Sequence, residues 1–559
     1  MNPTLTLLTA LLLAPSAALH AADFHVATNG SDRNPGTKDK PFQTISASIY
    51  KLNAGDTLLL GKGVYHEAIK VFSKSGSPGQ PITIAAEENG TVTVRGSVPV
   101  TGWLRSQGAQ PVYIHDTWTY YFGNLDLSQP NPPREKDARD KPRNLLFCEG
   151  EYIPEVFYPD SLKEHSFFVD KTHQRILLWL QNGDDPGKKL IEVADLETLA
   201  YFGNCNYFVI RGIRFERGAN SDQEPLVVVR GNNCLVEDCS MSQASAAGFG
   251  TYGSNTIVRR CVFNNNGQEG CNIFRTVNCR LEDCESSYNN NTPDKKFSHE
   301  YSCGGGKVLL NYGLVIARMK AQYNNGPGIW LDWSNNESTI SNCLCTDNKG
   351  AGIFCEVQYG VHIHDNVLIG NTPHGIHLAE SDGPVFERNL VIGSTYGLTF
   401  RDLDRKAPGL DANGVPDMSL NWGKWVPRWN QDLVIKNNVM AFNQNNQVIM
   451  SFSERMMPLA LQKVRQPDGL SLETLNIKVD NNIYWAEAVP YLYKWGELRF
   501  QSLDQIRKGL SVEENGQSLN PGFADWKNLD LRVPADSPLL KSGCYPQGEV
   551  PGVKLGVIK

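Results

Sequence analysis

A short pattern of apolar and polar positions returns through much of the chain. From about residue 205 to 485, an apolar residue is followed by about two polar ones, then by Cys, Met or Asn, and then by another apolar residue. The central positions are Cys239, Cys261, Cys284, Met319, Cys343, Asn366, Asn389 and Asn438. They lie 22 to 24 residues apart, except for two longer gaps. Short strands with this period and polar corners are typical of a β-helix. The pattern predicts an all-β chain that forms a right-handed parallel β-helix.

Breaks in the period indicate how the chain is divided. The two long gaps equal one rung plus a loop insertion each, at 291–311 and 402–431. Between 104 and 200 the period disappears and alternating strands take its place, which predicts an inserted β-rich subdomain. We therefore expect four structural parts: N-terminal rungs with a capping helix near 42–49 (23–103), the insert (104–200), the main β-helix (201–485), and a C-terminal cap (486–559) that protects the last sheet edges.

The N-terminus has the pattern of an export signal. An apolar stretch from Leu5 to Leu13 is followed by small residues, which predicts a signal peptide over residues 1–22. No later apolar run is long enough to span a bilayer, so we expect a periplasmic or secreted protein with no membrane attachment after cleavage. The net charge of −7 argues against a nucleic-acid partner, which needs a basic surface.

Thirteen cysteines in an exported chain would ordinarily suggest disulfide bonds. Here Cys239, Cys261, Cys284 and Cys343 recur in phase with the repeat, so we expect them to stack inside the coil as small, unpaired, apolar side chains. No CxxC or His-rich pairing accompanies them, and we expect no metal site.

A second strand in each rung opens on glycine. These segments are GFGTY (248–252), GCNIF (270–274), GIWLD (328–332), GIFCE (352–356), GIHLA (375–379) and GLTFR (397–401). Side chains alternate along a strand, so the second and fourth residues after each glycine share the outer face. This places Asp332 and Glu356 at equivalent outward positions on neighbouring strands, about 4.8 Å apart. Two repelling carboxylates at that spacing suit a retaining glycosidase, with one as nucleophile and the other as acid/base.

Other residues near this pair are expected to contact a sugar. Trp330 and Phe354 offer apolar rings, and His377 and Arg401 add hydrogen-bond donors on the next rungs. The 291–311 insertion is expected to fold over the groove as a lid. Its candidate substrate-binding residues are His299, Glu300 and Lys307, of which Glu300 is the main rival to Glu356 for the acid role.

The same segments carry a family resemblance. The stretches HE…GGGK (299–307), NNGPGIWLDW (324–333) and NKGAGIFCEVQYG (348–360) resemble glycoside hydrolase family 120, β-xylosidases built on a parallel β-helix with an intercalated β-rich region. The resemblance is strong over about 290–400 and architectural elsewhere. It implies that Asp332 is the nucleophile and Glu356 the acid/base of a carbohydrate-cleaving hydrolase that needs no cofactor.

Two alternatives stay open at this point. In a polysaccharide lyase, Asp332 and Glu356 would bind Ca²⁺ or a uronate, and Lys307 or Arg401 would act as base or charge neutraliser. In a non-catalytic carbohydrate-binding β-helix, the same face would hold a sugar chain without cleaving it. A lyase product absorbs ultraviolet light through its new double bond, a hydrolase product does not, and a binding protein releases no product.

Overall fold

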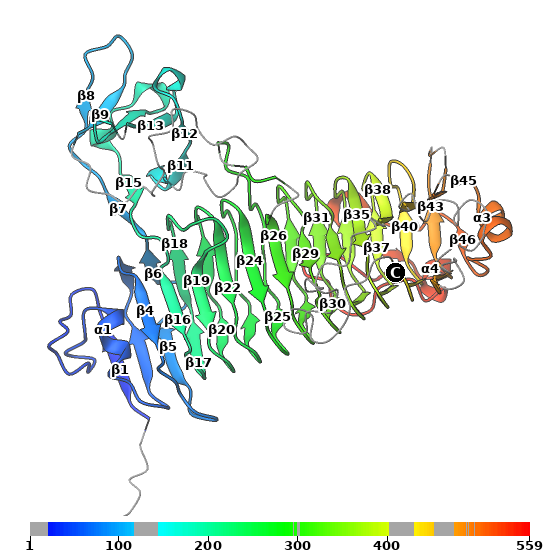
Figure 1. Ribbon diagram of the computed structural model, residues 1–559, viewed down its shortest axis with the longest axis horizontal. Coiled ribbons are helices and arrows are strands. Elements are labelled where there is room, and N and C mark those ends of the chain that lie inside the picture. Colours follow the sequence, from blue (N-terminus) through cyan, green and yellow to red (C-terminus); the bar gives the residue numbers. More distant parts are fainter. Residues whose placement is uncertain are drawn as a thin grey trace, which may run out of the picture.

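The stacked rungs form one long parallel β-helix (Figure 1). The computed structural model describes residues 21–116, 144–170, 172–294, 296–298, 302–401, 430–451, 475–487, 489, 491–496 and 498–559. Three predicted features lie outside these residues: nearly all of the signal peptide, His299 with Glu300, and most of the 402–431 insertion.

Three sheets run along the helix, and in each sheet a strand pairs in parallel with the strand one rung earlier. Sheet I has thirteen strands: β1 (Asp23–Val26), β2 (Thr57–Leu60), β5 (Ile82–Ala86), β17 (Phe208–Arg211), β20 (Leu235–Glu237), β23 (Ile257–Arg259), β25 (Arg280–Glu282), β27 (Val315–Ala317), β30 (Thr339–Ser341), β33 (His362–His364), β36 (Val385–Glu387), β39 (Val434–Lys436) and β42 (Lys478–Asp480).

Sheet II follows sheet I in each rung and is divided into two parts. The first part has four strands: β3 (Gly63–Tyr65), β6 (Val92–Arg95), β18 (Ile213–Glu216) and β21 (Ser240–Ser242). The second part has seven strands: β28 (Lys320–Gln322), β31 (Leu344–Thr346), β34 (Val367–Ile369), β37 (Leu390–Ile392), β40 (Val439–Ala441), β43 (Ile483–Trp485) and β46 (Gln517–Ser518). Single bridges through Val262 and Glu285 connect the two parts.

Sheet III contains the glycine-opened strands and carries the candidate site. Its thirteen strands are β4 (Ile69–Phe72), β16 (Ala200–Gly203), β19 (Pro225–Arg230), β22 (Ala247–Thr251), β24 (Glu269–Phe274), β26 (Gly304–Leu309), β29 (Ile329–Asp332), β32 (Ile353–Glu356), β35 (His374–Ala379), β38 (Tyr396–Arg401), β41 (Val448–Ser451), β44 (Tyr493–Trp495) and β45 (Leu498–Phe500). All pair in parallel except β44 with β45, which closes the last rung.

The repeated Cys and Asn positions form one column inside the coil. Cys239, Cys261 and Cys284 are buried in the core and unpaired, as predicted, and the other ten cysteines are free as well. Burial raises the pKa of the Cys261 thiol well above its usual range, so it stays an uncharged apolar group. Farther along, asparagines take over the column, and each amide hydrogen-bonds the next, as in Asn366 Nδ2 to Asn389 Oδ1 at 2.9 Å.

The inserted β-rich subdomain stands away from the first rungs (Figure 1). Its two sheets have their own apolar core and pair mainly antiparallel: β7 (Ser97–Pro99), β8 (Leu104–Arg105), β9 (Tyr113–His115), β10 (Leu146–Cys148), β11 (Glu151–Ile153), β12 (Glu155–Val156), β13 (Ser166–Asp170), β14 (Arg175–Trp179) and β15 (Ile191–Ala194). Tyr152 Oη donates to Asp294 Oδ2 at 2.8 Å, which ties the insert to the segment before β26.

The two ends of the helix are closed differently. At the N-terminal end, helix α1 (Ile45–Ile49) begins after Thr44, whose side chain caps it, and buries Ile45 and Ile49. At the other end, α3 (Leu503–Leu510) lies where the sequence predicts a short helix, and it buries Leu503 and Ile506 against the last rungs. No helix within the described ranges is long and apolar enough to cross a membrane.

The rest of the tail does more than cover the last rung. Residues 519–555 run back along sheet II, where Leu531, Val533 and Leu539 pack on the outer face of β34, β37 and β40. This segment includes α4 (Pro538–Lys541) and β47 (Val533–Pro534), and β47 pairs with β48 (Val557–Ile558) directly after the segment. The outward Leu, Val and Ile residues of sheet II predict a covering layer, but only the tertiary structure shows that the C-terminal tail supplies it.

Candidate active site on sheet III

Asp332 and Glu356 end two neighbouring strands of sheet III. Strands β29 and β32 pair in parallel with Leu331 opposite Cys355, and the next step of the same register aligns Asp332 with Glu356. Leu331 and Cys355 are fully buried in the core, so the alternation along the strand turns both carboxylates to the outer face. The prediction that the two acids lie on adjacent parallel strands is therefore confirmed.

The backbone just after each acid is held in a fixed bend. Trp333 and Val357 both adopt left-handed conformations, with φ of 43° and 58°. A β-branched residue such as Val rarely adopts this conformation, so the surrounding structure has to impose it. Side-chain amides help: Asn335 Nδ2 donates to Asp332 O at 2.9 Å, and Gln358 Nε2 donates to Leu331 O at 3.1 Å. These contacts end both strands at the same level and keep the two carboxyls side by side.

Lys307 lies in the sheet and not in a lid. Residues 304–309 form strand β26, which pairs with β29 and places Lys307 opposite Trp330. This corrects the expectation that the whole 291–311 segment folds over the groove. The Lys307 ammonium lies 2.9 Å from Asp332 Oδ2, and the two side chains are 14% and 15% exposed. The ammonium compensates the charge of Asp332 at this position.

Trp330, Phe354 and His377 form a stack across three rungs. The Trp330 and Phe354 ring centroids are 5.1 Å apart, and those of Phe354 and His377 are 4.5 Å apart with nearly parallel planes. Lys307 Nζ lies 4.0 Å from the Trp330 ring centroid. Because Lys307 and Phe354 lie against its ring and Trp330 is only 3% exposed, it does not offer the open face for a sugar that the sequence predicts.

His377 is a neutral imidazole in this stack. Burial, together with the nearby His374 and the positive Arg401, lowers its pKa to about 3. His374 was not singled out in the sequence, although it completes the group: its ring centroid lies 4.6 Å from that of His377, and its Nδ1 is 2.9 Å from Thr399 Oγ1. Arg401 is exposed and aligned with Ala379, in the same row as the two acids.

A buried carboxyl on the other side of Lys307 was missed in the sequence. Glu269 opens strand β24 and is 1% exposed. Its Oε2 accepts from Ser302 Oγ at 2.9 Å. Burial raises its pKa to about 7, although Ser302 and Lys307 act in the opposite direction. The only signal in the sequence is an acid directly before the glycine of GCNIF, a position that no other glycine-opened strand fills with Asp or Glu.

The arrangement has the parts of a two-carboxylate active site. It combines a charge-compensated Asp, a more buried Glu on the next strand, and an apolar stack beside both. Of the predicted residues, Asp332, Glu356, Trp330, Phe354, His377, Arg401 and Lys307 lie together on the outer face of sheet III. Within the described ranges, no three His, Cys, Asp or Glu side chains gather to hold a metal ion.

Comparisons of the sequence find β-helix and lyase relatives. Residues 278–391 match the family described as right handed beta helix region, and residues 40–105 match the family described as chondroitinase B. The uncharacterised protein YwoF of Bacillus subtilis is 44% identical over 72 residues, 13% of this chain and 15% of its own length. Pectate lyase PEL9 of Emericella nidulans is 32% identical over 132 residues, 23% of this chain and 32% of its own length. The chain thus spans a third or less of these relatives.

Comparison of the structures extends over the whole fold. The structure of XylC in complex with xylose superposes with a TM-score of 0.68 at 17% identity, covering 90% of this chain and 87% of that chain. A structure described as a glycoside hydrolase superposes with a TM-score of 0.53 at 12% identity, covering 68% of this chain and 95% of that chain. The chain therefore has the right-handed parallel β-helix fold with an inserted β-rich subdomain, as predicted, and its relatives and structural neighbours include carbohydrate-active enzymes.

Proposed function

We propose that this chain is an exported, retaining glycoside hydrolase that cleaves a plant, algal or host polysaccharide or oligosaccharide. The observation that carries the proposal is the pairing of β29 with β32, which aligns Asp332 with Glu356 on the outer face of sheet III. Strand spacing of about 4.8 Å is close to the separation of about 5 to 5.5 Å between the carboxyls of retaining glycosidases. The family 120 resemblance and the XylC–xylose neighbour favour a β-xylosidase-like substrate.

The two acids take different roles because their surroundings differ. Asp332, with the shorter side chain and with Lys307 at 2.9 Å, attacks the anomeric carbon as a carboxylate and forms a glycosyl ester. Glu356 is only 9% exposed, and Phe354 lies two residues before it on the same strand, on the same face. It donates a proton to the leaving glycosidic oxygen, then removes one from the water that cleaves the ester, so the anomeric configuration is retained.

An activated aryl glycoside separates the two roles, because its leaving group needs little protonation. Glu356→Ala should still form the glycosyl-enzyme, accumulate it, and be rescued by azide to a product of retained configuration. Asp332→Ala should be inactive without azide, and any product formed with azide should have the inverted configuration, because azide then displaces the leaving group in one step. Asp283→Ala is the control, since this exposed carboxylate pairs with Arg318 on sheet I, away from the site. Full activity of both Asp332→Ala and Glu356→Ala would refute the proposal.

A polysaccharide lyase is the second candidate, favoured by the matches to chondroitinase B over 40–105 and to the pectate lyases. In that reaction a base removes the proton next to a uronate carboxylate, and the glycosidic oxygen leaves across a new carbon–carbon double bond. Lys307 or Arg401 would serve as base or charge neutraliser. The lyase and the hydrolase are distinguished by incubating the protein with uronate polymers and with neutral polymers. Ultraviolet absorbance and the number of reducing ends are then measured in each reaction. Reducing ends without new absorbance support the hydrolase.

A further inference from the structure

The row of outward positions that contains Asp332 and Glu356 continues toward the N-terminal rungs. Parallel pairing aligns Asp332 with Leu309 and Leu309 with Phe274. The same register continues through Tyr252 and Arg230 to Gly203 and then to Phe72 on β4. Six inter-strand steps separate Phe72 from Asp332, which at about 4.8 Å each is about 29 Å along the helix axis. Strands β4 to β29 follow one another along this face in Figure 1.

This half of the row is lined with aromatic rings that contact one another. We call it the aromatic row, made of Phe72, Tyr201, Arg230, Tyr252 and Phe274. Tyr252 and Phe274 meet edge to face with centroids 5.9 Å apart, and Phe72 and Tyr201 lie 5.4 Å apart. Tyr201 comes from the adjacent row, and it can lean over because Gly203 has no side chain: a Cβ there would lie 2.8 Å from both rings.

A cation lies between the two groups of rings. The Arg230 guanidinium carbon is 4.3 Å from the Tyr252 centroid and 5.7 Å from that of Tyr201. Arg275 Cζ lies 5.1 Å from the Phe274 ring in the same way. Among the described residues, no carboxylate lies within ion-pair distance of Arg230, which is exposed. The guanidinium lies against these rings and is exposed, so those of its five N–H groups that do not contact Tyr252 can donate to hydroxyl or carboxylate oxygens of a ligand.

The row is open to solvent at its far end. Phe72 is 55% exposed, and the rings of Tyr201, Tyr252 and Phe274 are partly exposed. A folded monomer gains nothing from leaving a line of aromatic rings at the surface, and such lines mark binding sites. A ligand for this surface must be long, must repeat at about the strand spacing, and must offer an apolar face and oxygen acceptors together.

We propose that the aromatic row is a distal binding site for an extended polysaccharide chain that lies along the helix axis and reaches Asp332 and Glu356 at its end. Sugar rings have an apolar face that stacks on aromatic side chains and hydroxyl or carboxylate oxygens that accept from Arg230 and Arg275. A polymer in this position spans six rungs and places an internal or near-terminal bond at the two acids. The proposal rests on the proposed hydrolase in one respect, namely that the bound chain leads to a site of cleavage at Asp332 and Glu356. Binding of the chain to the aromatic row needs no catalysis.

The test measures binding apart from cleavage. All variants carry Asp332→Asn, which prevents cleavage during the measurement. Affinity electrophoresis compares this background with the same background plus Tyr252→Ala, Phe274→Ala or both. The gels contain xylan, polygalacturonate, mannan or mixed-linkage β-glucan. Loss of each ring should weaken binding to at least one polymer by about five- to ten-fold, the size of one aromatic contact. Tyr158→Ala is the matched control, because Tyr158 is 46% exposed on the insert. Melting temperatures identify any variant that fails to fold.

Arg230→Gln distinguishes what the row recognises. A larger loss on polygalacturonate than on the neutral polymers indicates a carboxylate-bearing chain, and equal losses indicate contacts to hydroxyls; both outcomes support the row. Binding that the ring variants leave unchanged, binding that Tyr158→Ala weakens equally, or a chain that binds none of the four polymers would overturn it. If the polymers bind through the row but the native chain cleaves none of them, the proposed hydrolase fails and the row stands.

In active enzyme the row should also affect polymers more than small substrates. The kcat/KM for the polymer, divided by that for an aryl glycoside, should fall at least ten-fold in the Tyr252→Ala, Phe274→Ala double variant, mainly through KM. A merely structural role for these rings would lower both values together and leave the ratio unchanged, which contradicts the proposal.

Discussion

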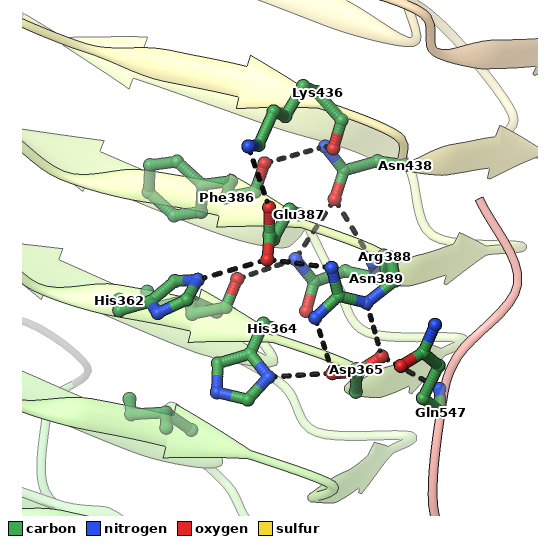
Figure 2. Close-up of polar contacts among 12 residues, drawn as sticks. His362, His364, Asp365, Phe386, Glu387, Arg388, Asn389, Lys436, Asn438 and Gln547 are labelled. Carbon is green, nitrogen blue, oxygen red and sulfur yellow. Dashed lines mark hydrogen bonds and ion pairs between the residues drawn. The ribbon is translucent and has the colours of Figure 1, made fainter. Parts of the chain in front are cut away.

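Sheets I and III both carry carboxylates on neighbouring strands, but they surround them differently. At the edge of sheet I, Glu387 at the end of β36 and Asp365 directly after β33 lie in a dense network of cations (Figure 2). Arg388 binds Asp365 at 2.9 and 3.0 Å and Glu387 at 2.7 Å, and Lys436 lies 3.1 Å from Glu387. On sheet III, Lys307 pairs with Asp332, and stacked rings of Trp330, Phe354 and His377 lie beside the acids.

The network on sheet I also binds the C-terminal tail. Gln547 N donates to Asp365 Oδ1 at 2.7 Å, so the network anchors the C-terminal tail that covers sheet II (Figure 2). Burial alone would raise the pKa of Asp365, but hydrogen bonds from His364 and Arg388 outweigh it and lower the pKa below its usual range. The sheet I carboxylates therefore hold the tail in place, whereas the sheet III pair lies beside stacked rings on the outer face, which suits reaction with a bound substrate.

The largest expected effect is on activity. Asp332→Asn should lower kcat/KM by at least about 10³-fold, because the amide cannot act as nucleophile. Its free energy of unfolding should change by no more than about 1 kcal/mol, because the amide oxygen still accepts a hydrogen bond from Lys307 and the exchange removes repulsion with Glu356. Steady-state kinetics and urea unfolding of the same preparation check both halves. A variant that is strongly destabilised would show that sheet III, like sheet I, uses its acids for the fold.

The reverse result is expected on sheet I. Asp365→Ala should lower the free energy of unfolding by about 3 kcal/mol, because it removes two hydrogen bonds from the partly buried Arg388, which keeps only Glu387, and releases the tail at Gln547. Activity per folded molecule should stay within two-fold of the native value. Asp283→Ala is the matched control: its pair with Arg318 is exposed, so the loss should stay below about 1 kcal/mol. Equal losses in the two variants would contradict a special role for Asp365.

Acid should weaken the sheet I network. The pKa values of Asp365 and Glu387 are both lowered in the folded chain, since the hydrogen bonds from His364 and Arg388 to Asp365, and from Lys436 and Arg388 to Glu387, outweigh burial. Their contribution to stability is therefore complete above the unfolded values of about 4, and it is lost as pH falls through the folded values. Urea unfolding from pH 6 to pH 3 should show this fall in the native chain and a smaller one in Arg388→Met. Parallel curves would exclude the network as the cause.

The smallest effect is spectroscopic. With its pKa near 3, His377 should keep one imidazole chemical shift between pH 5 and 8, because it stays neutral throughout. The imidazole of a histidine-containing peptide in the same buffer, which titrates near its ordinary value of about 6.5, serves as the reference. A His377 midpoint near 6.5 would mean that the stack with Phe354 is open to water.

The sequence by itself determined the coil and the position of the acids. A period of 22 to 24 residues and a glycine near the start of six sheet III strands are local signals that recur along the main coil, so they predict register as well as fold. Because register follows from the repeat, Asp332 and Glu356 could be placed side by side and the cysteines inside the coil. The same pattern also turns Tyr252 and Phe274 outward.

The tertiary structure decided whatever depends on contacts between parts that do not repeat. Lys307 follows an insertion, so its strand register and its ion pair with Asp332 could not be read from the period. Phe72 and the tail residue Gln547 lie far from their partners in sequence, and no local pattern links them. The physical reason is that a repeat specifies each rung against its neighbours, whereas side-chain partners across insertions, and the choice of which segment covers an apolar face, are set only when the whole chain packs.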